Sequence, residues 1–256
     1  MYSDDVLEGV GKEAAFFVFE NFRSLLKMAV ILAAVEASVW WLLPVAAISE
    51  ILQSLTGTIF YAVFAIAIHR WIILGELNFP PAIDLRILYF VGVMIVEGLA
   101  LGAVILGGVG PGLLIGVLIG SGALVVILMI VLVPVFLVCG VWLISRLITV
   151  YPHIAVSSLN SFQLSSGWEL SKEPVWQIAK RVLLFLVCTG VPILLIVSIM
   201  PETVGENAAT IGERTIWAPF TFLVLLVGYA PIPFFVALAS FVYRRLFDDL
   251  KAQIAT

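Results

Sequence analysis

Charged side chains are scarce in this sequence of 256 residues: they make up 12% of it, whereas hydrophobic residues make up 62%. An ordinary soluble domain carries roughly 25% charged residues, so the composition excludes that class and predicts an integral membrane protein. The formal net charge is -4, and the basic residues form no continuous face of the kind that binds phosphate backbones. Nucleic acid is therefore excluded as a partner.

Histidine and cysteine are also rare, with two of each in the chain. The sequence contains no HExxH motif, no pair of histidines at metal-binding spacing, no GxSxG nucleophile elbow and no loop that would cradle phosphate. Cys139 and Cys188 lie inside apolar runs, where a thiol packs as a small hydrophobic group. We therefore expect a protein that is not an enzyme and that uses no metal or cofactor.

Long apolar runs are what the sequence has in abundance. A helix of about 20 apolar residues matches a hydrocarbon core of about 30 Å, and this rule predicts one all-α, polytopic membrane domain over residues 1–256. The six predicted transmembrane helices cover residues 28–47, 54–73, 88–106, 121–143, 182–200 and 216–243. Residues 201–207 are expected to open the one sizeable loop on the outer side.

Residues 4–24 combine apolar and charged side chains with helical rather than strand periodicity. They predict an amphipathic helix whose phenylalanines suit the boundary between headgroups and acyl chains. These are Phe16, Phe17, Phe19 and Phe22. A helix docked on the bundle would show the same pattern, because a hydrophobic face does not distinguish lipid from protein. Both positions stay open.

The run from Gly98 to Ser145 holds 48 residues without a charge, far more than one crossing needs. We expect a break at Gly107–Gly112, followed by residues 113–120 as a short interfacial or tilted extension. Prolines removing backbone donors occur within the last three spans, where they either kink a helix or open a binding site. They are Pro134, Pro192, and Pro231 with Pro233.

The longest polar interval, residues 145–181, holds four of the 13 basic residues. With six spans and a cytoplasmic N-terminus, every basic residue except Arg214 falls on the cytoplasmic side, as the positive-inside rule requires. Both termini are then cytoplasmic. We also expect the interval to form a second amphipathic segment at the inner surface, broken at Gly167 and Pro174.

Basic and histidine side chains near the inner ends of the spans are candidates for contacts with phospholipid headgroups or with the membrane interface. They are His69, Arg70, Arg146, Lys172, Lys180 and Arg181. The positive-inside rule alone would also place the basic ones there. Membrane lipids, and another membrane protein or complex, are the partners that the sequence favours.

Two carboxyl groups, those of Glu36 and Glu97, lie inside predicted spans at similar depth, so they could meet. Carboxylates inside a bilayer are costly, and they mark proton or cation paths in transporters. Each is equally compatible with a protonated side chain that bonds a neighbouring helix. A carrier would need several further polar side chains facing both glutamates.

Two segments carry a family resemblance. One follows the order Arg146, Pro152, Ile154-Ala155-Val156, a serine run, Trp168-Glu169-Leu170-Ser171 and Trp176. It resembles the pattern Arg, Pro-x-Ile-Ala-Val, Ala-Trp-x-Leu-Ser, Trp-Arg of uncharacterised bacterial integral membrane proteins related to the membrane domain fused to some glycerophosphodiester phosphodiesterases. The other, residues 69–76, is similar to His-Arg-Phe-Val-Leu-Leu-Gly-Glu in alphaproteobacterial-type members.

The resemblance implies a bacterial inner-membrane protein of about six helices. It implies no reaction, because the phosphodiesterase chemistry belongs to a separate domain. The chain departs from the pattern at His153, where a small residue is usual, and at Gln177, where a basic residue is usual. We expect a non-enzymatic protein that binds lipid or a membrane-protein partner, as a scaffold or accessory subunit. The alternative is a small transporter or proton-coupled carrier that uses Glu36 and Glu97.

Overall fold

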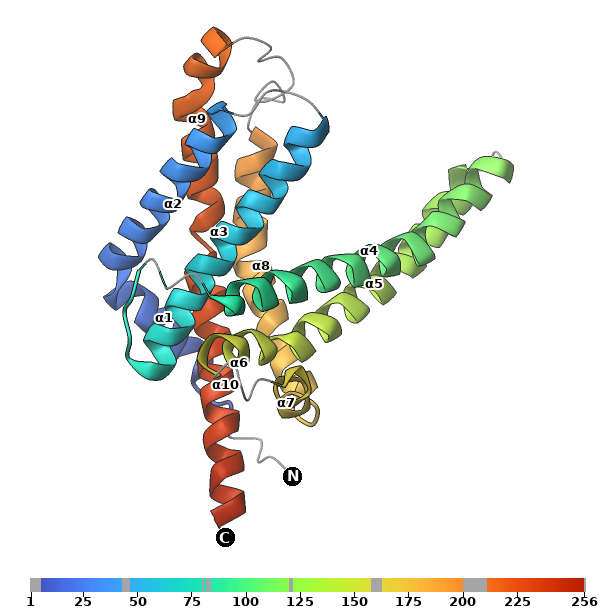
Figure 1. Ribbon diagram of the computed structural model, residues 1–256. Helices are drawn as coiled ribbons and strands as arrows, with labels where there is room; N and C mark the ends of the chain where they lie inside the picture. The colour runs from blue at the N-terminus through green and yellow to red at the C-terminus, as the bar shows by residue number, and fades with distance from the viewer. Residues whose placement is uncertain are drawn as a thin grey trace.

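The computed structural model describes residues 6–42, 47–79, 81, 84–119, 122–157, 163–199 and 211–255, and over these residues the chain contains helices and no strands. Figure 1 shows their arrangement. The helices are α1 (Val10–Glu20), α2 (Phe22–Leu42), α3 (Ala47–Leu74), α4 (Leu85–Ile119), α5 (Gly122–Leu147), α6 (Val150–Val156), α7 (Leu164–Leu170), α8 (Val175–Ile199), α9 (Ile211–Tyr229) and α10 (Ile232–Ala255).

Five stretches of helix in the described part of the chain are long and apolar enough to cross a membrane. They are Phe22–Leu42, Ile51–Leu74, Leu85–Ala103, Pro134–Val156 and Ala218–Ala255. The chain is therefore a multi-pass membrane protein. The predicted span at residues 182–200 is not among the five, although α8 covers it as far as Ile199. The count of six stays a prediction.

Helix α3 lies at the centre of the bundle, where it contacts α2, α4, α6 and α10. Its last turns hold much of the core, because Phe64 and Ile68 are fully buried there. Helices α4 and α5 pack against each other along a hairpin that diverges from the other long helices (Figure 1). Cys139 on α5 and Cys188 on α8 are exposed, so the expectation that both thiols pack inside was wrong. The outward faces of a membrane bundle are as apolar as its core. An apolar run therefore does not show whether a thiol within it faces the core or the outside.

The predicted break at Gly107–Gly112 was also wrong, because α4 continues without interruption from Leu85 to Ile119. In a bilayer each backbone donor must be satisfied inside its own segment, and glycine does not prevent this. The extension expected at 113–120 is thus the last part of α4, apart from Gly120, which lies outside the described residues. At about 1.5 Å per residue, a helix of 35 residues exceeds the hydrocarbon thickness and must tilt or project.

A proline produces a break where the sequence predicted one span. Residues 216–243 are divided between α9 and α10, which are separated by a turn at Ala230 and Pro231. Proline has no N–H to continue the hydrogen bonds of α9, and its ring clashes with the preceding turn. The division lets α9 pack on α2 while α10 packs on α1 and α3. In contrast, α5 continues through Pro134.

Helix α1 is docked on the bundle, and its position at the membrane boundary stays a prediction. Val10, Ala14 and Val18 are buried, in a helix that packs on α10. Phe19 packs edge-on against Phe234 of α10, with 5.7 Å between the ring centroids, and is still 69% exposed. The predicted helix at 4–24 is shorter than expected, since it ends at Glu20 and α2 begins at Phe22.

Within the polar interval 145–181, the described helices α6 and α7 form a packed cap on the bundle, and the predicted amphipathic placement at the inner surface stays a prediction. Five of the seven residues of α6 are buried, and α7 packs directly on α6. Gly167 was predicted as a break, but it lies within α7 and allows the close contact: a Cβ there would lie 2.9 Å from the Cα of Val150. The hydroxyl of Thr149 donates to the carbonyl of Gly167 at 2.6 Å. The hydroxyl of Ser171 donates to the carbonyl of Arg146 at 2.8 Å.

We predict that Gly167→Ala lowers the stability of the protein by about 1–3 kcal/mol, because the new methyl group meets backbone atoms that cannot rotate away. Thermal unfolding in mild detergent measures this change. Gly98→Ala is the matched control, since nothing lies within 4 Å of a Cβ at that helical glycine. Equal melting temperatures for the two variants would contradict the close packing of α6 and α7.

Candidate functional site: the basic end of the bundle

Most basic side chains lie at one end of the bundle, which we call the basic end. It comprises the C-terminal ends of α3 and α5, the short helices α6 and α7, the N-terminal end of α8 and the second half of α10 (Figure 1). The sequence-predicted candidates His69, Arg70, Arg146, Lys172, Lys180 and Arg181 all belong to it. The structure gives these residues four different kinds of surroundings.

Arg70 and Arg181 hold elements of the protein together. Arg70 donates to the carbonyl of Ala155 in α6 at 3.2 Å and also pairs with Glu76. Arg181 donates to the carbonyl of Leu7 at 2.8 Å, which joins the start of the described chain to α8. Burial lowers the pKa of Arg181, but an arginine keeps its charge at any physiological pH. Both guanidinium groups therefore make their contacts within the protein.

His69 lies in the core and is only 1% exposed, although the sequence suggested a place at the membrane interface. Its Nδ1 lies 2.7 Å from the hydroxyl of Ser240 in α10. That hydroxyl donates its single hydrogen to the carbonyl of Val236 at 2.8 Å, so the histidine must be the donor and carries its proton on Nδ1. His69 therefore joins α3 to α10. The pattern of apolar and polar residues in one helix does not indicate which residue of another helix a buried histidine contacts.

Lys172 and Lys180 remain as exposed cations at the surface. Lys172 forms a surface pair with Glu169 at 3.4 Å. Lys180 lies on a face of the first half of α8 whose residues are exposed and recur at helical spacing. This face runs from Trp176, which is 58% exposed, through Lys180 to Leu183, Leu184 and Val187. An indole and an ammonium followed by aliphatic side chains are the order found at a membrane interface.

Arg146 is the most buried arginine or lysine of the set, with only 5% of its surface exposed. Its guanidinium stacks on the ring of Trp168, 4.4 Å from the centroid. Trp142 packs edge-on against Trp168, with 6.2 Å between the ring centroids. The Nε and Nη1 atoms of Arg146 are buried and find no hydrogen-bond partner in the described part of the protein.

The two intramembrane glutamates have separate partners. The hydroxyl of Tyr229 in α9 donates to Glu36 Oε2 at 2.6 Å. Glu97 accepts a hydrogen bond from Tyr151 in α6. No hydrogen bond joins the two carboxyl groups among the residues that the structure describes. The predicted possibility that they meet has no support in these contacts, and each glutamate links one pair of helices.

The position of the Glu36 carboxyl group also requires a glycine on the neighbouring helix α3. A Cβ at Gly57 in α3 would lie 2.8 Å from Glu36 Oε1, so glycine leaves the space that the carboxyl group occupies. The sequence offered no sign of this contact or of either tyrosine partner, because helix rotation decides which residues face each other.

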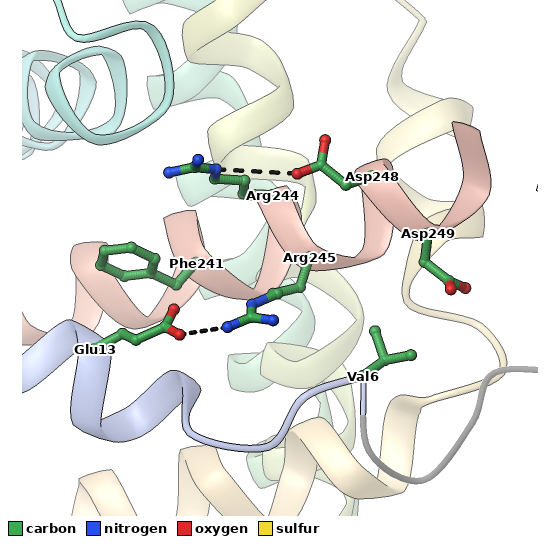
Figure 2. A pocket seen from close by; sticks show the side chains of 7 residues that line it. All are labelled: Val6, Glu13, Phe241, Arg244, Arg245, Asp248 and Asp249. Carbon is green, nitrogen blue, oxygen red and sulfur yellow. Dashed lines mark hydrogen bonds and ion pairs between the residues drawn. The ribbon is translucent and has the colours of Figure 1, made fainter. Parts of the chain in front are cut away.

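A polar cavity of about 640 Å³ opens between the segment around α1 and the second half of α10 (Figure 2). It is lined by Val6, Glu13, Phe241, Arg244, Arg245, Asp248 and Asp249. Arg245 pairs with Glu13 across the cavity, and Arg244 lies 4.0 Å from Asp248 within α10. The charges of this cavity are thus largely matched within the protein. No group of three or more metal-ligating side chains occurs in the described ranges.

No family model, curated protein or solved structure matches this chain. The family resemblance of the segments at 146–176 and 69–76 therefore stays a prediction. Function has to be inferred from the geometry of the described residues.

We predict that the Glu36–Tyr229 and Glu97–Tyr151 contacts are energetically independent. Double-mutant cycles with Glu→Gln and Tyr→Phe should give a coupling energy of roughly 0.5–1.5 kcal/mol within each pair, the range of hydrogen bonds between membrane helices. The free energy of unfolding in mixed micelles is the measured quantity.

The crossed cycles are the control, and Glu36→Gln with Tyr151→Phe should be additive within about 0.5 kcal/mol. Strong coupling in the crossed cycles would mean that the two carboxyl groups share one site.

Proposed function

We propose that this chain is a non-enzymatic, six-span protein of the bacterial inner membrane that binds anionic phospholipid at its basic end. Both termini then lie in the cytoplasm, and the basic end faces the cytoplasmic leaflet. In this role the protein serves as a scaffold or accessory subunit for a membrane-protein partner.

The directions of the helices support six crossings. Helices α2, α4 and α8 run away from the basic end, whereas α3, α5 and the pair α9–α10 return to it (Figure 1). The positive-inside rule assigns an end rich in arginine and lysine to the cytoplasm. Helix α1 lies near this end, and its exposed Phe19 suits the boundary between headgroups and acyl chains.

The observation that carries the proposal is the exposed face of α8. Trp176 and Lys180 lie one turn apart at the basic end, and Leu184, which is 64% exposed, follows on the same face. This order brings an ammonium and an indole to headgroup level while the aliphatic side chains meet acyl chains. Exposed Lys172 adds a second positive charge next to this face. Two lysines near the surface attract anionic lipid over zwitterionic lipid.

The carrier hypothesis has weaker support. A carrier needs several polar side chains around its buried carboxyl groups, but the described hydrogen bonds join Glu36 and Glu97 to one tyrosine each. The cavity between α1 and α10 is lined by other residues. These contacts favour a structural role for both glutamates.

We expect Lys172→Ala combined with Lys180→Ala to weaken the preference for phosphatidylglycerol over phosphatidylcholine by about 1 kcal/mol for each lysine. Spin-labelled lipids in reconstituted vesicles report the relative association constants, and salt should remove the difference. The matched control combines Lys12→Ala with Lys251→Ala, two exposed lysines that lie outside the exposed face of α8. Identical lipid preferences for the two double variants and the unaltered protein would refute the proposal.

A further inference from the structure

We infer that Arg146 binds the phosphate group of one phospholipid, whose acyl chain lies along the exposed face of α5. The inference deepens the proposed lipid binding, but it concerns a separate residue and a single bound molecule. It rests on three features that meet at one place. They are the unpaired charge of Arg146, the indole rings of Trp168 and Trp142, which we call the aromatic wall, and the exposed residues Trp142, Val138 and Val135 of α5, which we call the apolar stripe.

The unpaired charge is the first step. Arg146 is buried, and the structure gives Nε and Nη1 no acceptor among the described residues. A guanidinium removed from water without a partner is strongly unfavourable, and each orphaned buried donor calls for a missing acceptor. The acceptor has to be an anion or a strongly polar group that the chain itself does not supply.

The acidic side chain near Arg146 does not meet this need. Glu169 acts on Arg146 electrostatically, but no ion pair within 4.0 Å joins them in the described part of the chain. The carboxylate of Glu169 is well exposed and pairs with Lys172 at 3.4 Å. Glu169 therefore pairs at the surface with Lys172 rather than with Arg146, and the guanidinium of Arg146 is left without an acidic partner.

The aromatic wall determines how the guanidinium is presented. Trp168 of α7 covers one face of the guanidinium plane at 4.4 Å, and Trp142 supports Trp168 edge-on. Stacking on an indole leaves the N–H groups at the edges of the plane. An edge of a guanidinium matches two phosphate oxygens through parallel, charge-assisted hydrogen bonds.

The apolar stripe shows where the rest of the ligand lies. Arg146, Trp142, Val138 and Val135 share one face of α5 at helical spacing, and all except Arg146 are exposed. An acyl chain that extends from a phosphate at Arg146 would follow this stripe into the bilayer. A free phosphate ion would gain nothing from it, which is why the geometry favours the lipid.

The test uses the full chain, stripped of lipid in mild detergent, with dioleoyl phosphatidylglycerol, dioleoylglycerol and inorganic phosphate as separate probes. We expect phosphatidylglycerol to raise the melting temperature saturably, with one tightly bound lipid per chain in native mass spectrometry. Dioleoylglycerol lacks the phosphate and should have no such effect. Inorganic phosphate lacks the acyl chain, and stabilisation by it equal to that by the lipid would overturn the assignment to a phospholipid.

Variants at Arg146 test the residue itself. Arg146→Met should lose the tightly bound lipid, and Arg146→Lys should bind it at least about tenfold more weakly, because a bidentate pair becomes a single contact. Without lipid, Arg146→Met should be as stable as the unaltered protein or more stable, since it removes an unpaired buried charge. A purely structural arginine would instead lower the melting temperature with and without lipid, and that result would overturn the inference.

Arg244→Met is the matched control, because that arginine is exposed and makes only a long pair within α10. It should keep the bound lipid. If Arg146→Met also keeps one lipid per chain while the variant with Lys172→Ala and Lys180→Ala loses its lipid preference, the Arg146 site is refuted and the proposed function stands. If the variant with Lys172→Ala and Lys180→Ala keeps its lipid preference while Arg146→Met loses the bound lipid, the Arg146 site stands. Lipid binding by the two lysines is then refuted.

Discussion

A charge without a partner is unfavourable in the hydrocarbon of a bilayer. This free-energy cost determines where the charged side chains of the protein lie. Most of the described basic side chains lie at the basic end. The charged or acidic groups further inside have dedicated neighbours: Glu36 meets Tyr229, Glu97 meets Tyr151, and Arg146 stacks on Trp168. The polar interval 145–181 becomes a packed cap for the same reason, because its hydroxyl groups satisfy backbone carbonyls of the helices they join.

The helical class of the fold and most of its long helices could be predicted from the apolar runs, because a bilayer requires long uncharged helices. The boundaries of the helices could not be predicted in this way. Gly107–Gly112 looks like a loop by the rules for water-exposed chains, yet the structure continues α4 through it. Pro231 was compatible with a kink or with a broken helix within one span, and the structure separates α9 from α10 there. The effect of such local signals depends on what surrounds the helix.

The candidate site was predictable in its membership but not in its contacts. Sequence placed Arg146, Lys172 and Lys180 at one end of the bundle, as the positive-inside rule does. It could not show that Arg181 bonds the carbonyl of Leu7, 174 residues away, or that Gly57 leaves room for Glu36. Such contacts depend on the rotation of whole helices about their axes, and a single sequence carries no record of that rotation.

The central claim is that the basic end faces the cytoplasm in a chain with six crossings. Single cysteines introduced as Lys172→Cys or Asn207→Cys, in a chain with Cys139→Ala and Cys188→Ala, can be labelled in spheroplasts with a membrane-impermeant maleimide. The account predicts that Asn207→Cys reacts in intact spheroplasts, whereas Lys172→Cys reacts only after lysis. Labelling of Lys172→Cys in intact spheroplasts would contradict it.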